Sequence, residues 1–173
     1  MKIKINFSNY YKNKVFFENL KIDFSNALVL LDIDGTLVED GGVILSTPVL
    51  SKLDEIKRNN IIKICSNKRD EMRKKKFEQL LEIEYLDSKY KKPNKKITSL
   101  FSSDGRSIVV IGDKFFTDGL LAIKISARFI KIDRKSDGKE PFLIKFSYMI
   151  DNIAWFFWRS LFIHKKNETS KNI

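Results

Sequence analysis

The chain alternates short, continuous apolar runs with polar stretches that carry apolar residues at helical spacing. The runs are apolar throughout, as in strands buried on both faces, rather than alternating between apolar and polar residues. The sequence therefore predicts an α/β fold: a Rossmann-like, mostly parallel sheet of about five strands with helices on both faces. The expected strands cover residues 27–31, 61–64, 83–85, 107–111 and 128–132.

The expected helices fill the intervals between these runs. They cover residues 50–60, 68–81, about 93–101 and 118–125, and an apolar helix follows at about 140–164. At 173 residues the chain has about the length of one domain. We expect a single domain over residues 1–173, with its core at about 24–135 and an amphipathic helix at the C-terminus.

Polar residues suited to catalysis follow each of the first four expected strands, at the edge where open α/β sheets bind ligands. Several carboxylates would meet beside a lysine, and like charges at close range repel unless a cation offsets them. Mg²⁺ would do so, because it prefers oxygen ligands and keeps waters for a phosphate. The residues are Asp32 and Asp34 after the first run, Ser66 and Asn67 after the second, Lys92 after the third, and Asp113 with Asp118 after the fourth.

In this order, the segments DIDGTL, CSN, KKP and VVIGDKFFTD resemble the four signature motifs of the haloacid dehalogenase (HAD) superfamily of phosphohydrolases. Each motif by itself has an ordinary structural explanation. An aspartate–glycine pair forms turns, a serine caps helices, and a lysine in a lysine-rich stretch is usually solvated. The joint order, with each motif after an expected strand, favours an active site.

The resemblance implies a phosphomonoesterase that works through an aspartyl-phosphate intermediate. It implies that Asp32 is the nucleophile and that Asp34 is the general acid and base. It also implies that the Ser66 hydroxyl and the Asn67 backbone N–H bind the phosphoryl oxygens. Lys92 would neutralise the charge that develops on the transferred group.

The resemblance further implies Mg²⁺ as the cofactor. Asp32 and Asp113 would hold the ion through their carboxylates, and Asp34 would do so through its backbone carbonyl. Asp118 would support the same metal site, directly or through a water molecule.

Within the superfamily, the chain is most similar to subfamily IIIA, which includes the phosphatidylglycerophosphate (PGP) phosphatase family and its small bacterial relatives. The intervals 37–65 and 67–92 leave no room for an inserted cap domain, so we expect a capless core with an open site. Two positions depart from the subfamily pattern. Those relatives usually have Asn where Gly35 and Lys68 stand, next to catalytic positions.

The net charge and the C-terminal segment indicate what kind of partner the protein binds. The formal net charge of +11 would attract an anionic partner, although AT-rich coding would also produce abundant lysine. The stretch 142–163 is nearly all apolar or aromatic. Its polar residues Lys145, Asn152, Arg159 and Lys166 recur every seven positions. Such a helix suits an anionic membrane interface, where the protein would bind peripherally. The alternative is a helix packed on the sheet or on a second copy of the chain.

The resemblance to the PGP phosphatase family, together with the capless core and the C-terminal helix, implies dephosphorylation of PGP to phosphatidylglycerol at a membrane surface. One alternative is a capless HAD phosphatase for a soluble metabolite, a nucleotide or a nucleic-acid end. Another is a basic nucleic-acid-binding module that has lost catalysis, suggested by the charged run 68–76. Acidic residues interrupt that run and argue against nucleic acid. The single cysteine, Cys65, indicates a reducing compartment, and we expect a cytoplasmic protein.

Overall fold

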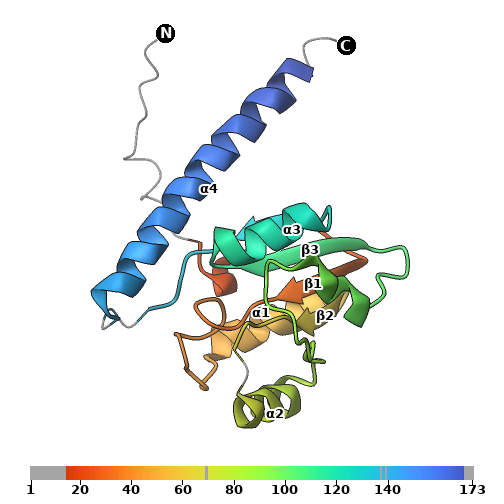
Figure 1. The fold of residues 1–173 in the computed structure, drawn as a ribbon. Coiled ribbons are helices and arrows are strands. Elements are labelled where there is room, and N and C mark those ends of the chain that lie inside the picture. The colour runs from red at the N-terminus through yellow and green to blue at the C-terminus, as the bar shows by residue number, and fades with distance from the viewer. Residues whose placement is uncertain (1–14, 69, 137, 139, 170–173) are drawn as a thin grey trace.

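The sheet at the centre of the computed structural model is parallel throughout and has the strand order β2-β1-β3-β4 (Figure 1). The structure describes residues 15–68, 70–136, 138 and 140–169, with side chains described as far as residue 160. The strands are β1 (Ala27–Leu31), β2 (Ile61–Ile64), β3 (Ser107–Gly112) and β4 (Arg128–Lys131). The apolar runs predicted an α/β fold with a parallel sheet, and the structure confirms that prediction.

The prediction of about five strands is wrong, because the described residues form a sheet of four. The expected strand at 83–85 contributes a single isolated bridge, between Ile64 and Tyr85. Only two backbone hydrogen bonds hold it: Ile64 N–H donates to Glu84, and Leu86 N–H donates to Ile64. The segment starts right after the left-handed Glu82, and within it only Tyr85 forms a bridge, so it does not extend the sheet.

Helical segments connect the strands, and most lie where periodicity predicted them. The expected helix at 93–101 is a 3-10 helix, and the one at 118–125 begins earlier, as a π-helical turn. The segments are η2 (Phe17–Asn19), α1 (Thr47–Lys57), α2 (Glu71–Leu81), η3 (Lys95–Leu100), η4 (Phe115–Gly119), α3 (Leu120–Lys124) and α4 (Phe142–Thr169).

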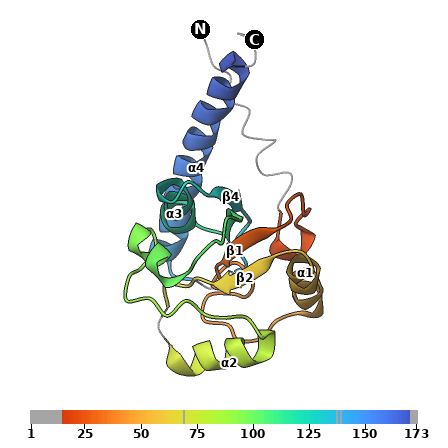
Figure 2. The same ribbon diagram turned by 90° about the vertical axis from the view of Figure 1, so that its right-hand side faces the viewer.

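Both faces of the sheet are covered, as the apolar strands require. Every residue of β1 is buried. On one face β1 packs against α1 through Leu53 and against α2 through Phe77. On the other face it packs against η3 through Ile97 and against α3 through Leu121. Figure 2 shows α1 and α3 on opposite sides of the sheet. The carboxyl ends of β1 and β3 therefore remain free to carry a site.

The C-terminal helix α4 lies against η4 and β4, and its C-terminal half projects beyond the sheet (Figures 1 and 2). Trp155 packs on Phe129 and Phe115, with ring centroids 5.4 and 5.6 Å apart. One face of α4 is thus packed on the domain, which was the alternative to membrane contact. Large apolar side chains remain exposed elsewhere on it: Phe142, Leu143, Phe146, Met149, Ile150, Ile153 and Phe157.

The polar stripe expected on α4 is described in part. Lys145 and Arg159 are exposed and Asn152 is half-buried, while Lys166 lies outside the described side chains. Within the described residues, no helix combines the length and the apolar character needed to cross a membrane.

Candidate active site

The loop after β1 folds back on itself and places two carboxylates at the edge of the sheet. The Ile33 carbonyl accepts hydrogen bonds from the N–H groups of Thr36, Leu37 and Val38. Gly35 has a φ of +79°, in the left-handed region that glycine enters without steric cost. A Cβ at this position would lie 2.1 Å from Asp113 Oδ2. The glycine therefore lets the β1 loop approach the carboxylate that follows β3.

Three carboxylates meet beyond the carboxyl ends of β1 and β3. Leu31 is paired with Ile111 in the sheet, so the residues that follow these two strands are neighbours. Ligand atoms of Asp32, Asp113 and Asp118 lie within 4.8 Å of one another, and all three residues are buried. The structure thus brings together the carboxylates that the motifs predicted as metal ligands.

Lys92 lies among these carboxylates and is itself buried. Its Nζ donates to Asp32 Oδ1 at 2.7 Å and to Asp118 Oδ1 at 2.5 Å. Burial acts to lower the pKa of Lys92, but Asp118 and Asp32 raise it well above its ordinary value, so the amine is charged. The Asn67 side chain holds the backbone of Lys92 from both sides, with bonds of 2.6 and 3.1 Å. Asn67 is therefore a positioning residue for Lys92.

The positive charges near the cluster do not offset the burial of its carboxylates. Burial raises the pKa of Asp32 to about 8, with Lys92 opposing the shift and Asp118 adding to it. Burial raises the pKa of Asp113 to about 7, again with repulsion from Asp118. Among the described residues, Asp113 Oδ2 accepts no hydrogen bond, and Arg134 Nε lies 4.0 Å from it. This set of crowded oxygen donors, one of them without a hydrogen bond, fits a hard divalent cation.

The Asp34 carboxylate faces away from this cluster, toward α2. Arg73 binds it through two nitrogens, with Nη2 2.8 Å from Oδ1 and Nη1 2.9 Å from Oδ2. Burial acts to raise the pKa of Asp34, but the hydrogen bonds from Arg73 and from the Gly41 N–H outweigh it, so the pKa lies below its ordinary value. Arg73 and the Gly41 N–H thus hold the carboxylate in its ionised form, and a metal contact through the backbone carbonyl of Asp34 stays a prediction.

Ser66 and Lys68 complete the rim beside Asp34. The Ser66 hydroxyl lies 3.4 Å from Asp34 Oδ2 and accepts a hydrogen bond from the Lys68 N–H. Lys68 Nζ pairs with Asp40 at 2.5 Å and lies 3.6 Å from Asp34. The lysine that departs from the subfamily pattern therefore adds positive charge at the opening of the site.

A small cavity of about 170 Å³ joins these groups. It contains every predicted site residue except Asp118, which is buried behind Lys92 and Asp32. The residues that line the cavity are Asp32, Asp34, Ser66, Asn67, Lys68, Lys92, Asp113, Lys114, Thr117 and Tyr148.

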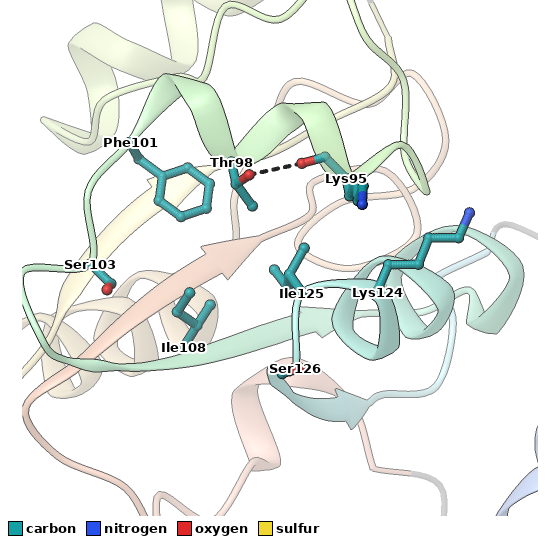
Figure 3. Close-up of a pocket in the computed structure, with 8 residues that line it drawn as sticks. All are labelled: Lys95, Thr98, Phe101, Ser103, Ile108, Lys124, Ile125 and Ser126. Atoms are coloured by element: carbon teal, nitrogen blue, oxygen red, sulfur yellow. Dashed lines mark hydrogen bonds between the residues drawn. The ribbon is translucent and has the colours of Figure 1, made fainter.

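A larger cavity of about 400 Å³ lies between η3 and α3, away from the carboxylate cluster (Figure 3). Its walls carry the apolar side chains of Phe101, Ile108 and Ile125, with Lys95 and Lys124 at the rim. No carboxylate lines this cavity. The smaller cavity is the candidate active site, because it is the one lined by the carboxylates and by Lys92.

Besides Lys68, Lys114 and Thr117, which line the cavity, three further residues around the site were not predicted from the sequence. Arg73 falls inside the basic run 68–76, where its burial has no sequence signal. Tyr148 on α4 lines the site, and the sequence gives no sign of it. Asp151 on α4 is fully buried, and a single acid in an apolar stretch was a signal that could have been used.

Comparison with known proteins agrees with this geometry. The family model of the mitochondrial PGP phosphatases matches residues 6–134. The matched segment contains β1 to β4 and every predicted site residue, whereas α4 lies beyond its end. No curated protein and no solved structure matches the chain.

Proposed function

Because the chain belongs to the mitochondrial PGP phosphatase family, we propose that it is a capless, Mg²⁺-dependent phosphatase that removes the terminal phosphate of PGP. The observation that carries this proposal is the buried group of three carboxylates and Lys92 at the carboxyl edge of the sheet. Crowded oxygen ligands beside a charged lysine are suited to phosphoryl transfer, where positioning and charge stabilisation do most of the work.

In the first step, Asp32 attacks the phosphorus and the bond to the ester oxygen breaks, which leaves an aspartyl-phosphate. Lys92 holds one oxygen of Asp32, and the Thr36 hydroxyl lies 3.4 Å from the other, so the carboxylate is oriented before substrate arrives. Mg²⁺ held by Asp32, Asp113 and Asp118 would neutralise negative charge on the transferred group. Ser66 and the Asn67 N–H bind the phosphoryl oxygens.

Asp34 acts as the general acid in the first step and as the general base in the second. It gives a proton to the departing alcohol, then takes a proton from the water that attacks the aspartyl-phosphate, which releases phosphate and restores Asp32. Its low pKa in the free protein means that it must acquire the first proton when substrate binds. The negative charge of the incoming phosphate favours this protonation, because a nearby like charge raises the pKa of a carboxyl group.

The size of the site supports a substrate whose bulk stays outside. A cavity of about 170 Å³ is smaller than the ~300–1,000 Å³ of sites that enclose drug-sized ligands. Only a phosphoryl group and a few further atoms enter it. The exposed apolar side chains of α4, together with the exposed Lys145 and Arg159, support peripheral contact with an anionic membrane that presents such a lipid.

Phosphate release from vesicles that contain PGP tests the proposal. We expect release that requires Mg²⁺ and that Asp32→Asn lowers by at least about 10³-fold, as loss of a nucleophile does. Asp54→Asn, an exposed carboxylate on α1, is the matched control and should keep full activity. Release from soluble phosphate esters but not from vesicles would sink the lipid assignment and favour a soluble substrate.

A further inference from the structure

The loop that follows β3 carries two of the three clustered carboxylates, and it turns tightly. Asp113 comes directly after the strand, and Asp118 lies in the π-helical turn η4. A Cβ at Gly112 would lie 2.4 Å from Asp118 Cγ, so the turn packs directly on the end of β3. Because both carboxylates belong to one short loop, a small shift of this loop would displace both of them from Asp32.

The turn does not supply acceptors for its own first N–H groups. The Asp118 N–H donates to the Lys114 carbonyl at 2.8 Å, which closes the turn. Lys114, the residue before η4, makes no side-chain hydrogen bond that would cap it. The N–H groups at the start of a helical turn have no partner within the turn, so those of Phe115 and Phe116 need an acceptor from another part of the chain.

Asp151 on α4 supplies that acceptor. It is fully buried, and its two oxygens accept the N–H groups of Phe115 and Phe116 at 2.8 and 2.7 Å. Lys131 Nζ lies 3.2 Å from the same carboxylate and also donates to the backbone carbonyl of Asp113. Asp151 is thus linked to the loop at two points, at Asp113 and at the start of η4. A buried carboxylate is costly unless it is paired in this way, so these contacts fix the loop relative to α4.

We propose that Asp151 is a positioning residue for the metal site, which holds the loop after β3 in the conformation that brings Asp113 and Asp118 to Asp32. The inference rests on the proposed function and deepens it, because it makes α4 a determinant of Mg²⁺ affinity. Mg²⁺ tolerates little departure from its preferred geometry, so its ligands must be held in place by the groups behind them. Residue 151 lies beyond the segment 6–134 that the family model matches, so the matched motifs do not include this contact.

Asp151→Asn tests the inference, because it keeps the size of the side chain and removes one acceptor. The amide nitrogen of Asn cannot accept a hydrogen bond, so one of the two loop N–H groups loses its partner. We expect the Kd of Mg²⁺, measured by isothermal titration calorimetry on the free protein, to rise about 10-fold, as the loss of a group that orients metal ligands does. Phosphate release from PGP vesicles should then need about 10-fold more Mg²⁺ to reach half its maximal rate.

Two further variants separate positioning from a loss of stability. Ile56→Val removes one methyl group from the core at α1, across the sheet from α3 (Figure 2). It should lower the melting temperature and leave the Kd of Mg²⁺ unchanged below the melting transition. Lys131→Met keeps the length of the side chain but cannot donate, so the Asp113 carbonyl loses its link to Asp151. We expect it to raise the Kd of Mg²⁺ about 3-fold, and it carries the test if Asp151→Asn does not fold.

An unchanged Kd of Mg²⁺ in folded Asp151→Asn would overturn the inference. An equal rise in Ile56→Val would also overturn it, since Mg²⁺ affinity would then follow stability alone. Wild-type protein that binds no Mg²⁺ would overturn it as well. Wild-type protein that binds Mg²⁺ but releases no phosphate from PGP contradicts only the proposed function, and the Kd values of the variants still decide the inference.

Discussion

Two carboxylates on the β1 loop, Asp32 and Asp34, stand two residues apart in opposite electrostatic surroundings. Asp32 is buried beside Asp113 and Asp118, and burial raises its pKa to about 8. Asp34 is bound by Arg73, and its pKa lies below the ordinary value. The positive charge around the first carboxylate does not offset its burial, whereas the positive charge around the second does.

The difference arises from the elements that surround each side chain. The neighbours of Asp32 come from the loops before η3 and after β3, and those of Asp34 come mainly from α2 and the loop around Gly41. A divalent cation among the three clustered carboxylates would therefore act on Asp32 and leave Asp34 to Arg73. Separated pKa values of this kind allow two neighbouring acids to take different catalytic roles.

The substitution Gly35→Asn would disturb the surroundings of Asp32, and we expect from it the largest effect among variants that keep every catalytic residue. Asn adopts positive φ more readily than most residues, so the backbone is tolerated. Its Cβ, however, would lie 2.1 Å from Asp113 Oδ2 and would displace that carboxylate. Misplacing a catalytic group by about 1 Å can cost about 100-fold, so we expect a loss of that size in kcat/KM and weaker Mg²⁺ dependence.

Phosphate release measured over a Mg²⁺ titration checks this prediction. Gly105→Asn is a matched control, because Gly105 has a φ of +77° and no heavy atom lies within 4 Å of where a Cβ would be. The relatives that the motifs resemble usually have Asn at the position of Gly35. Full activity in Gly35→Asn with an unchanged Mg²⁺ requirement would show that the reaction does not require the Asp113 carboxylate at its present position.

The position of Asp32 beside Asp113 could be predicted from the sequence, because the order of the strands in the sheet is enough to bring the two residues together. Residues that follow neighbouring parallel strands meet at one edge, so the order of β1 and β3 brings Asp32 and Asp113 together. Lys92 was located by its motif, since the segment before it forms no full strand. The fold class followed from the same apolar runs, and the miscounted strand at 83–85 was the shortest of them.

The contact of Arg73 with Asp34 and the place of Tyr148 in the cavity wall could not be predicted, because both depend on how the helices pack against the sheet. Arg73 looks like any member of a basic run until α2 packs on the sheet through Phe77 and turns Arg73 toward Asp34. Tyr148 reaches the site only because Asp151 fixes α4 to the loop at Phe115. Periodicity shows that these helices exist, but it does not give the residue at which each one meets the site.

In the absence of divalent cations, the pair Asp32 and Asp113 should affect the pH dependence of stability in the opposite direction to Asp34. The folded protein binds the protons of Asp32 and Asp113 more tightly than the unfolded chain, whose carboxyl pKa is about 3.9. Stability should therefore fall as the pH rises from about 4 toward 8. The contribution of Asp34, whose pKa is lowered, is present above about pH 3.9 and is lost only below it.

We expect the melting temperature of metal-free protein to be ~5 °C lower at pH 8 than at pH 5, and added Mg²⁺ to raise it more at pH 8. Differential scanning calorimetry measures both effects. Asp32→Asn removes one of the two buried acids whose pKa is raised and should reduce the difference in melting temperature between the two pH values. A melting temperature that rises steadily from pH 5 to pH 8 in metal-free wild type would contradict the unbalanced burial of Asp32 and Asp113.

The smallest effect is expected from Arg73→Lys, which weakens the partner of Asp34 without removing its charge. Lysine cannot donate two parallel hydrogen bonds to Asp34 while also reaching the Gly42 carbonyl, as Arg73 does. The pKa of Asp34 should rise toward its ordinary value. Since Asp34 must be protonated to release the alcohol, the alkaline limb of the pH profile of kcat/KM should move up by about half a pH unit. We expect kcat at neutral pH to fall about 3-fold, because the carboxylate is held less firmly.

The leaving group separates this effect from a general loss of structure. A glycerol leaving group needs the proton from Asp34, whereas p-nitrophenolate leaves without one. The shift in the alkaline limb should therefore be seen with glycerol 3-phosphate and not with p-nitrophenyl phosphate. Arg128→Lys alters a similar two-oxygen contact, to Asp23 on the exposed surface, and should change neither profile. If Arg73→Lys lowers kcat equally for both esters and leaves the limb in place, Arg73 acts by packing α2 against the Gly42 loop. The protonation of Asp34 would then be independent of Arg73.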